Sequence, residues 1–295
     1  MSATNRLSLG AAIAWIALSV VVISGSAAAC WYYYGYLQKV RSTDSAFNVS
    51  ILVQTGPERE ALKNSYLAEV LDLSIDQPTN IYAFDLDKAR DSLLASPVIK
   101  EAVVKAFNPG TVYVDYTIRK PVAYIGDYTN TAVDQEGFLF PAEPYYTPKR
   151  LPEVYLGLPE EMSAEDLWGQ QLHSVEYKKA LDVIAATSRI FGAGSSRVIK
   201  VDVSKAFADS YGKRQIVLTI EEQITQETAS LPVLCCLPRI LRLHSVHYEA
   251  ALREYVVLRD HLRGKLPIPD GSMQLIRHPV AVIDLRLPSL AYVTD

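Results

Sequence analysis

Two pairs of residues in the last third of the chain carry side chains that can bind metals. Cys235 and Cys236 are adjacent, and His244 and His247 follow them with two residues between the histidines. Thiolate and imidazole are common zinc ligands, but zinc motifs separate their cysteines, and adjacent cysteines are awkward ligands for one tetrahedral ion. We therefore predict no metal site. The cysteines are expected to pack as small apolar groups in a strand, with the histidines on a loop and at a helix start.

Other residue types that could support catalysis do not form a known arrangement. The glycines within 192–196 follow a predicted helix and precede a strand, whereas phosphate-binding loops follow a strand and open a helix. Glu221 and Glu222 end a predicted strand, where neighbouring side chains point to opposite faces, so they cannot readily flank one bond. No G-x-S-x-G motif occurs, and the remaining histidines have no nucleophile near them in the sequence. The sequence predicts a protein with no enzyme activity and no cofactor.

The chain begins with a long apolar run. No charged residue occurs from Leu7 to Leu37, and about 20 apolar residues are enough to cross the hydrocarbon core of a bilayer. The run ends in a cluster of aromatic rings that suits the headgroup boundary, and Lys39 and Arg41 follow it. The rings are those of Trp31, Tyr32, Tyr33, Tyr34 and Tyr36. The sequence predicts a transmembrane helix here.

A second interpretation of this run stays open. Residues 26–29 are small and end the apolar stretch as at a signal-peptidase site, and Cys30 follows them directly. Cleavage with lipidation of Cys30 would make the protein a lipoprotein, although lipoprotein signals usually carry a larger aliphatic residue where Ala27 stands. Positive charges flank the run on both sides, so the positive-inside rule does not decide the orientation.

Composition limits the other possibilities. The chain has 295 residues, of which 49% are hydrophobic, so it can form two ordinary domains besides the apolar run. Its 29 basic and 33 acidic residues give a net charge of -4, which provides no broad positive field for a nucleic-acid backbone. Three cysteines, two of them adjacent, cannot form a disulfide framework. The domains must be held together by their apolar cores.

A compact α+β unit is predicted after the apolar run. The expected elements are a strand at 49–53, a helix at 58–73 that Pro57 starts, a helix between Asp85 and Pro97, and two strands at 98–107 and 112–118 that flank Asn108-Pro109-Gly110. Leu86, Ala89 and Leu93 are expected to face inward from the second helix. This order of strand, helix, helix, strand and strand ends near Pro121.

The remainder of the chain is predicted to be a β-rich domain with helices. Strands are expected at 123–128, 131–133, 138–140, 198–203, 214–220, 239–243 and 281–287, with helices at 176–191 and 248–262. We expect Tyr177, Leu181, Ile184 and Phe191 on the inner side of the first helix. The last strand closes the chain.

Several segments together resemble the FtsQ/DivIB family of cell-division proteins. The segments are LLASPVIKEAVV at 93–104, NPGTVYV at 108–114, RKPVA at 119–123, AVDQEGFLF at 132–140, LPEV at 151–154 and IDLR at 283–286. The first three are similar to a POTRA domain of that family, and the next two resemble the segment that follows it. The order of membrane helix, POTRA domain and β-rich domain agrees with the order of predicted elements.

The resemblance implies an α+β protein in five parts. These are a short cytoplasmic segment at 1–8, a transmembrane helix at 9–37, a linker at 38–46, a POTRA domain at 47–121 and an FtsQ-like β domain at 122–295. It implies a bacterial inner-membrane protein at the division site whose C-terminal domain is extracytoplasmic. Such a protein has no catalytic residues and recruits FtsB- and FtsL-like coiled-coil proteins upstream of septal peptidoglycan synthesis.

The resemblance also implies a binding site. In this family the last strand accepts a partner strand along its edge, where unpaired backbone N–H and C=O groups give affinity and alternate side chains give selectivity. Carried over by position, the edge is formed by Arg286, Leu287, Ser289 and Ala291, with Pro288 removing one donor. The alternative function is that of a POTRA-containing envelope assembly factor or lipoprotein chaperone, and lipid on Cys30 would favour it.

Overall fold

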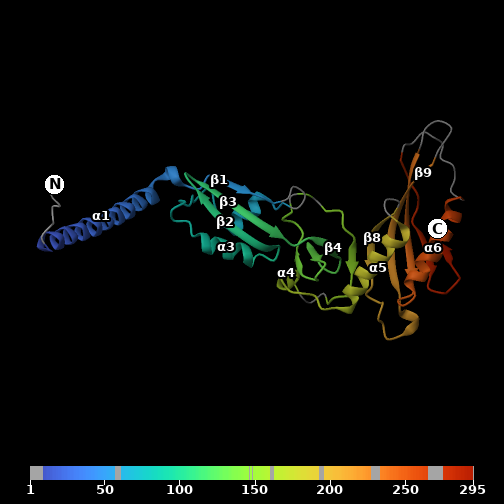
Figure 1. Ribbon diagram of the computed structural model, residues 1–295. Coiled ribbons are helices and arrows are strands. Elements are labelled where there is room, and N and C mark those ends of the chain that lie inside the picture. Colours follow the sequence, from blue (N-terminus) through green and yellow to red (C-terminus); the bar gives the residue numbers. More distant parts are fainter. Residues whose placement is uncertain are drawn as a thin grey trace, which may run out of the picture. The chain divides into compact units, whose positions relative to one another are not determined.

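The protein is an α+β chain of two compact units, the first of which begins with a long apolar helix (Figure 1). The computed structural model describes residues 9–56, 61–145, 147, 149–159, 163–192, 196–226, 233–264 and 275–294. Unit 1 consists of the chain up to Gly56 together with Asn64–Ala95 and Glu101–Tyr116, and unit 2 of the remainder. The predicted cytoplasmic segment at 1–8 lies outside the described residues.

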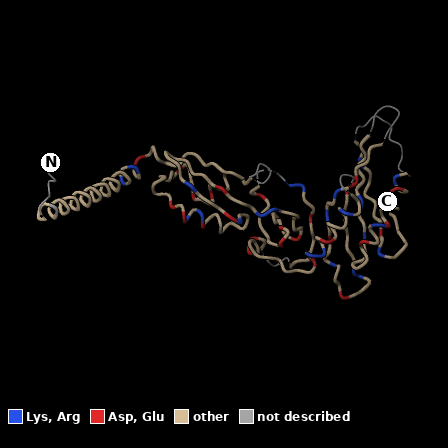
Figure 2. Tube along the Cα trace, viewed as in Figure 1, with Lys and Arg blue, Asp and Glu red and all other residues tan. Residues whose placement is uncertain are grey.

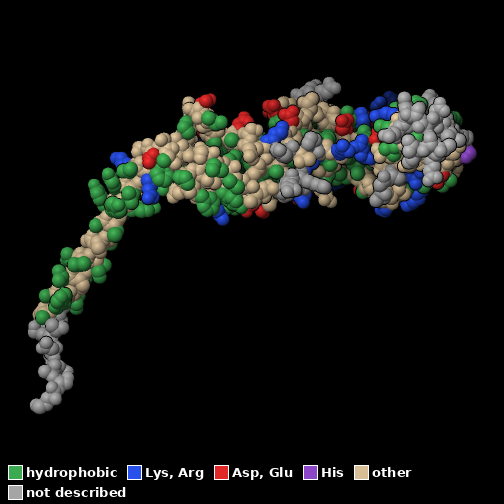
Figure 3. All heavy atoms as spheres, turned by 90° about the horizontal axis from the view of Figure 1, so that it is seen from above, with side chains coloured by type: hydrophobic (Ala, Val, Ile, Leu, Met, Phe, Trp, Pro, Cys, Tyr) green, Lys and Arg blue, Asp and Glu red, His purple; other side chains and the backbone are tan. Residues whose placement is uncertain are grey.

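Helix α1 runs from Leu9 to Thr43 and is long and apolar enough to cross a membrane. Figure 2 shows that charged residues along α1 are confined to its C-terminal end, and Figure 3 shows hydrophobic side chains along its surface. Since 35 residues rise about 50 Å at 1.5 Å each, the helix exceeds the roughly 30 Å hydrocarbon core. The most apolar 18-residue window of α1 is 0% buried within the protein.

The linker expected at 38–46 is corrected by the structure. Helix α1 continues to Thr43, and the 3₁₀ turn η1 at Ser45–Phe47 follows, capped by Asp44. The end of α1 is bonded to the body of unit 1, because the Asn80 Nδ2 atom donates to the carbonyl oxygens of Arg41 and Asp44, each at 2.9 Å. Arg41 also donates to the Tyr82 hydroxyl at 3.2 Å. The sequence between 38 and 43 contains neither Gly nor Pro, so nothing in it ends the helix early.

Unit 1 has the predicted order of strand, helix, helix, strand and strand. Its elements are β1 (Ile51–Gln54), α2 (Asn64–Val70), α3 (Leu86–Ala95), β2 (Ile99–Phe107) and β3 (Thr111–Ile118). The sheet order is β1-β3-β2, with β1 parallel to β3. Leu67 and Leu93 from the two helices and Val112 and Val114 from β3 are fully buried and form the core.

Two predictions in this unit fail in part. The helix expected at 58–73 is confined to Asn64–Val70, because Leu62 pairs with Tyr145 as an isolated β-bridge; its expected start at Pro57 lies outside the described residues. Leu86 is 38% exposed and does not face inward. Asp85 caps α3, since its Oδ1 atom accepts from the backbone N–H groups of 87 and 88.

Gly110 shows why the turn between β2 and β3 needs its glycine. The carbonyl oxygen of Gly110 accepts hydrogen bonds from the N–H groups of Ser50 and Ile51, which brings the start of β1 against the turn. A Cβ atom on Gly110 would lie 2.1 Å from the Asn48 carbonyl oxygen. Only glycine permits this close approach of two backbones.

Unit 2 contains a ten-stranded sheet. Its strands are β4 (Pro121–Ile125), β5 (Thr131–Asp134), β6 (Leu139–Pro141), β7 (Glu153–Tyr155), β8 (Ser196–Asp202), β9 (Ile216–Gln226), β10 (Val233–Leu243), β11 (Leu275–Arg277), β12 (Ala281–Leu285) and β13 (Tyr292–Thr294). The order is β13-β12-β10-β9-β8-β7-β4-β5-β6, and β11 pairs with β10 beside this path. The long β9–β10 hairpin is central.

Helices α5 (Val175–Phe191) and α6 (Tyr248–Arg263) pack on the sheet and on each other, and the short α4 (Ala164–Leu167) contacts β6. Buried and half-buried residues alternate along β9. Ile216, Leu218 and Ile220 are 0% exposed, and the residues between them are half-buried. Tyr255 of α6 is also fully buried against the same cluster. Period-two alternation with one covered face is typical of such a layered α+β unit.

Three strand predictions need correction. Strands β9 and β10 each have 11 residues and extend well beyond the expected 214–220 and 239–243, so Glu221 and Glu222 lie within β9 and not at its end. Strand β12 stops at Leu285 and not at Leu287. Strand β13 was not predicted at all, because three β-forming residues at a chain end provide no periodic pattern.

Candidate functional site

The C-terminal edge of the large sheet is formed by β12 and β13. Strand β12 pairs in parallel with β10 over five residues and antiparallel with β13 over three. Val282, Ile283 and Asp284 face Thr294, Val293 and Tyr292 respectively. Strand β13 is therefore the edge strand of the sheet, and β12, whose alternate residues are buried, is second from the edge.

The four residues predicted to form a binding edge do not lie on a strand. Arg286, Leu287, Ser289 and Ala291 lie in the turn that connects β12 to β13. Ser289 has a φ of 59°, and the Leu290 N–H donates to the Leu287 carbonyl oxygen, so the chain reverses direction here. The assumption of an extended edge at these positions is corrected, and their role in partner binding stays a prediction.

Arg286 is held within this turn by an ion pair. Its Nε and Nη2 atoms donate to both carboxylate oxygens of Asp284, with a shortest distance of 2.7 Å. Arg242 of β10 lies 3.7 Å from the same carboxylate. Burial raises the pKa of the Asp284 carboxyl, but the hydrogen bonds and charge of Arg286 outweigh burial and hold this pKa below its usual value. Asp284 therefore stays ionised and fixes the start of the turn.

A cavity of about 380 Å³ lies beside the turn. Its wall is formed by Tyr211, Gly212, Arg214, His244, Asp284, Arg286, Leu287 and Tyr292. His244 follows β10 directly, and its Nε2 atom lies 2.9 Å from the Tyr211 hydroxyl oxygen. Its Nδ1 atom accepts from the N–H of Val246 at 3.1 Å. The cavity combines aromatic surface with cationic groups next to the end of the sheet.

His244 is expected to make unit 2 less stable in acid. Burial lowers the pKa of its imidazole, and the neighbouring His247 and Arg214 lower it further. The pKa of His244 in the folded state lies below the ordinary value of 6.5, so the unfolded state binds the proton more readily. The stability that the neutral imidazole contributes is therefore complete above pH 6.5 and is lost as the pH falls below it. Urea titrations of the full chain in detergent at pH 7.5 and 5.5 measure this loss of stability. The urea concentration at the midpoint of unfolding should be lower at pH 5.5.

His244→Asn provides the control for this prediction. The Asn side-chain oxygen can replace Nδ1 as the acceptor for the Val246 N–H but does not titrate. The variant should lose part of the difference between the two midpoints. An unchanged difference would show that other groups cause the pH dependence.

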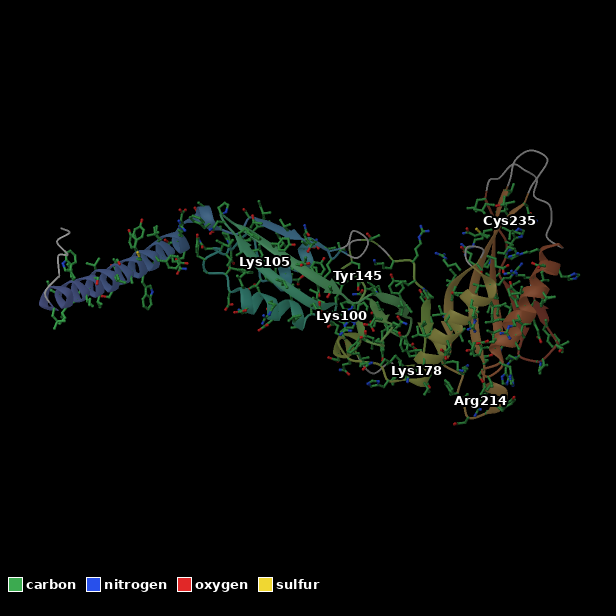
Figure 4. All side chains as sticks on the ribbon, in the orientation of Figure 1. Lys100, Lys105, Tyr145, Lys178, Arg214 and Cys235 are labelled. Carbon is green, nitrogen blue, oxygen red and sulfur yellow. The ribbon has the colours of Figure 1, made fainter. Side chains whose placement is uncertain are left out.

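The residues considered for metal binding are separated by the structure. Cys235 is buried and Cys236 half-buried, on opposite faces of β10, whereas His244 and His247 lie beyond its other end. Eight strand residues from Cys236 to His244 span on the order of 25 Å. Figure 4 shows Cys235 and Arg214 at opposite ends of the β9–β10 hairpin. Within the ranges that the structure describes, no group of three His, Cys, Asp or Glu side chains is arranged to hold a metal ion.

The glycine segment is a connector at its described end. Gly192 ends α5 with a φ of 76°, and its N–H donates to the Ser188 carbonyl oxygen, which is how glycine commonly terminates a helix. Residues 193–195 lie outside the described part of the chain. Strand β8 follows, so the order of helix, glycines and strand agrees with the sequence prediction.

The chain was also compared with known proteins. No model of a known protein family matches the chain, and no curated protein matches it significantly.

Proposed function

We propose that this protein is a membrane-anchored scaffold of the FtsQ/DivIB type, which binds FtsB- and FtsL-like coiled-coil division proteins through its extracytoplasmic part and links them to septal peptidoglycan synthesis. The observation that carries the proposal is the order of the chain: α1, then the β1-α2-α3-β2-β3 unit, then a large sheet that ends in C-terminal strands. We place it in the bacterial inner membrane at the division site.

The POTRA assignment is supported by unit 1. Its order of strand, helix, helix, strand and strand is the one that the sequence resemblance implies, and the β1-β3-β2 sheet is covered by two short helices. The segments that carry the resemblance include β2, the turn at Gly110 and β3. We therefore propose residues 47–121 as the POTRA domain and 122–295 as the partner-binding β domain.

The binding mode that we propose is strand addition at the C-terminal edge of the large sheet. An added strand gains affinity from backbone hydrogen bonds and selectivity from alternate side chains. The turn that holds Arg286 and Leu287 borders this edge, and Leu287 is 55% exposed although it is apolar. Its exposed side chain is a suitable anchor for a partner that lies along the edge.

A binding titration with matched variants tests this proposal. The full chain in nanodiscs is titrated with purified FtsB- and FtsL-like coiled-coil proteins from the same cell. Leu287→Ser is expected to weaken binding about tenfold, as truncation of an interface anchor does. Val257→Ser is the control, because Val257 is an exposed aliphatic residue on α6 and is 76% exposed.

Two outcomes would contradict the proposal. If the parent chain does not bind the coiled-coil proteins, the scaffold function fails, and an envelope assembly factor becomes the better interpretation. If Leu287→Ser and Val257→Ser weaken binding equally, the binding site is not at the C-terminal edge.

A further inference from the structure

We propose that β13 is a detachable placeholder, which occupies the edge of β12 until a partner strand of similar residue pattern replaces it. This inference rests on the proposed function, because it concerns the same edge of the sheet. It adds an intramolecular competitor and a rule for the sequence of the partner segment.

Strand β13 is weakly attached. It has three residues, all of them exposed, and Tyr292 is 62% and Val293 41% exposed. Among the residues that the structure describes, it pairs with β12 through a three-residue ladder. The entropy lost by fixing three exposed residues is of the same order as the net gain from so few hydrogen bonds. A strand of this kind can leave without disturbing the core.

Strand β12, in contrast, is firmly attached to the sheet and to the core. Ala281, Ile283 and Leu285 are at most 3% exposed, and the strand pairs with β10 over five residues. When β13 leaves, the backbone groups of residues 282–284 that faced it lose their partners. An unpaired strand edge is a template for another extended chain.

The register of β13 predicts the pattern of the segment that replaces it. Val293 faces Ile283, whose side chain is buried toward the helices, so an aliphatic residue suits this position. Tyr292 faces Asp284 and lines the cavity that contains Arg214 and His244, so an aromatic residue suits the adjacent position. Thr294 faces Val282 on the same face as Tyr292. The partner segment should therefore carry an aromatic, an aliphatic and a small β-branched residue in succession.

A reversible disulfide tests whether β13 must leave. Val282→Cys with Thr294→Cys introduces two thiols at facing positions, where the Cα atoms of antiparallel strands lie about 4.5–5.5 Å apart, within reach of a disulfide. Cys30→Ser is included in every form, so that the exposed native thiol does not interfere. The oxidised full chain in nanodiscs is expected to bind the FtsB- and FtsL-like proteins at least about tenfold more weakly than the same sample after reduction.

A truncated form tests whether removal of β13 strengthens partner binding. A chain that ends at Ala291 lacks β13 but keeps the predicted binding residues, and it should bind the same proteins about tenfold more tightly than the parent, since no competitor occupies the edge. Hydrogen exchange of the full chain without partner gives an independent measurement. The β13 amides that donate to β12 should exchange at least about 100-fold faster than the β12 amides that donate to β10.

The outcomes separate this inference from the proposed function. Equal binding by the oxidised and reduced forms would overturn the inference and leave the scaffold function standing. Equal protection of the β13 amides that donate to β12 and the β12 amides that donate to β10 would also overturn it. Absence of binding by every form, the truncated one included, would overturn the proposed function and this inference with it.

Discussion

Replacing Glu222 with alanine is expected to lower the free energy of unfolding of unit 2 by about 3–5 kcal/mol. The Glu222 side chain is 1% exposed and lies on the helix-covered face of β9. Its carboxylate oxygens lie 3.7 Å from Arg259 and 3.2 Å from Arg263, both on α6. Removal of the carboxylate leaves two largely buried guanidinium groups without this counter-charge, and an uncompensated buried charge is costly.

The neighbouring residue provides a matched control. Glu221 lies on the opposite face of β9, where its carboxylate is 3.7 Å from Arg197 and 3.6 Å from Arg277. The side chains of these arginines are 51% and 71% exposed, so their ion pairs contribute little in water. Glu221→Ala should cost less than about 1 kcal/mol. Urea denaturation of the full chain in detergent, followed by near-UV circular dichroism, measures both variants, and equal losses would contradict the assignment of Glu222 as a buried anchor.

The position of Glu222 could have been inferred from the sequence. Ile216, Leu218 and Ile220 alternate, so continuation of the period by one step places residue 222 on the core face. The predicted strand covers 214–220 with Glu221 and Glu222 at its end, and glutamate is rarely found on a core face. Arg259 and Arg263 are spaced by four residues on α6 and reach the same carboxylate. A charged residue at a core position thus indicated a partner elsewhere in the chain.

The strongly periodic elements were predictable from the sequence. Helix α1, helices α5 and α6 and the strands on both sides of Gly110 match the expected ranges within a few residues, apart from the extension of α1 to Thr43. The inner face of α5 was predicted only in part: Tyr177 and Phe191 are buried, whereas Leu181 and Ile184 are half-buried against the core. Ala180 and Val183 occupy the centre of that face, because small side chains allow the helix to approach the sheet closely.

The candidate site was less predictable, because it depends on contacts between distant residues. The sequence placed the last strand correctly from Ala281 but could not show that the chain reverses at Ser289. A positive φ at serine is uncommon, and no glycine marks this turn. The same reversal decides the expected effect of removing β13. Loss of β13 removes no residue of β12, so it uncovers an edge of the sheet.

Replacing Asp134 with alanine is the second change for which we expect a large loss of stability, again about 3–5 kcal/mol. The Asp134 side chain is 6% exposed and the Arg119 side chain 16% exposed, and the Arg119 Nη1 atom donates to the Asp134 Oδ2 atom at 3.0 Å. The Asp134 Oδ1 atom accepts from the N–H groups of Glu136 and Phe138, which closes the turn between β5 and β6. The Asp134 carboxylate therefore orders a tight turn and neutralises the largely buried guanidinium of Arg119. The same guanidinium lies 3.8 Å from the centre of the Phe138 ring.

Two further variants separate these roles of Asp134. Asp134→Asn keeps an acceptor for the turn but removes the charge, so its loss should be smaller, roughly 1–3 kcal/mol. Glu136→Ala should cost less than about 1 kcal/mol, because the Glu136 side chain is 58% exposed and its ion pairs, at 3.0 Å with Lys100 and 3.9 Å with Arg119, are solvated. Thermal unfolding of the full chain in detergent measures all three. If Asp134→Ala and Glu136→Ala reduce Tm equally, the Arg119–Asp134 pair does not stabilise unit 2. The conformation of the turn alone must then explain why β5 and β6 pair.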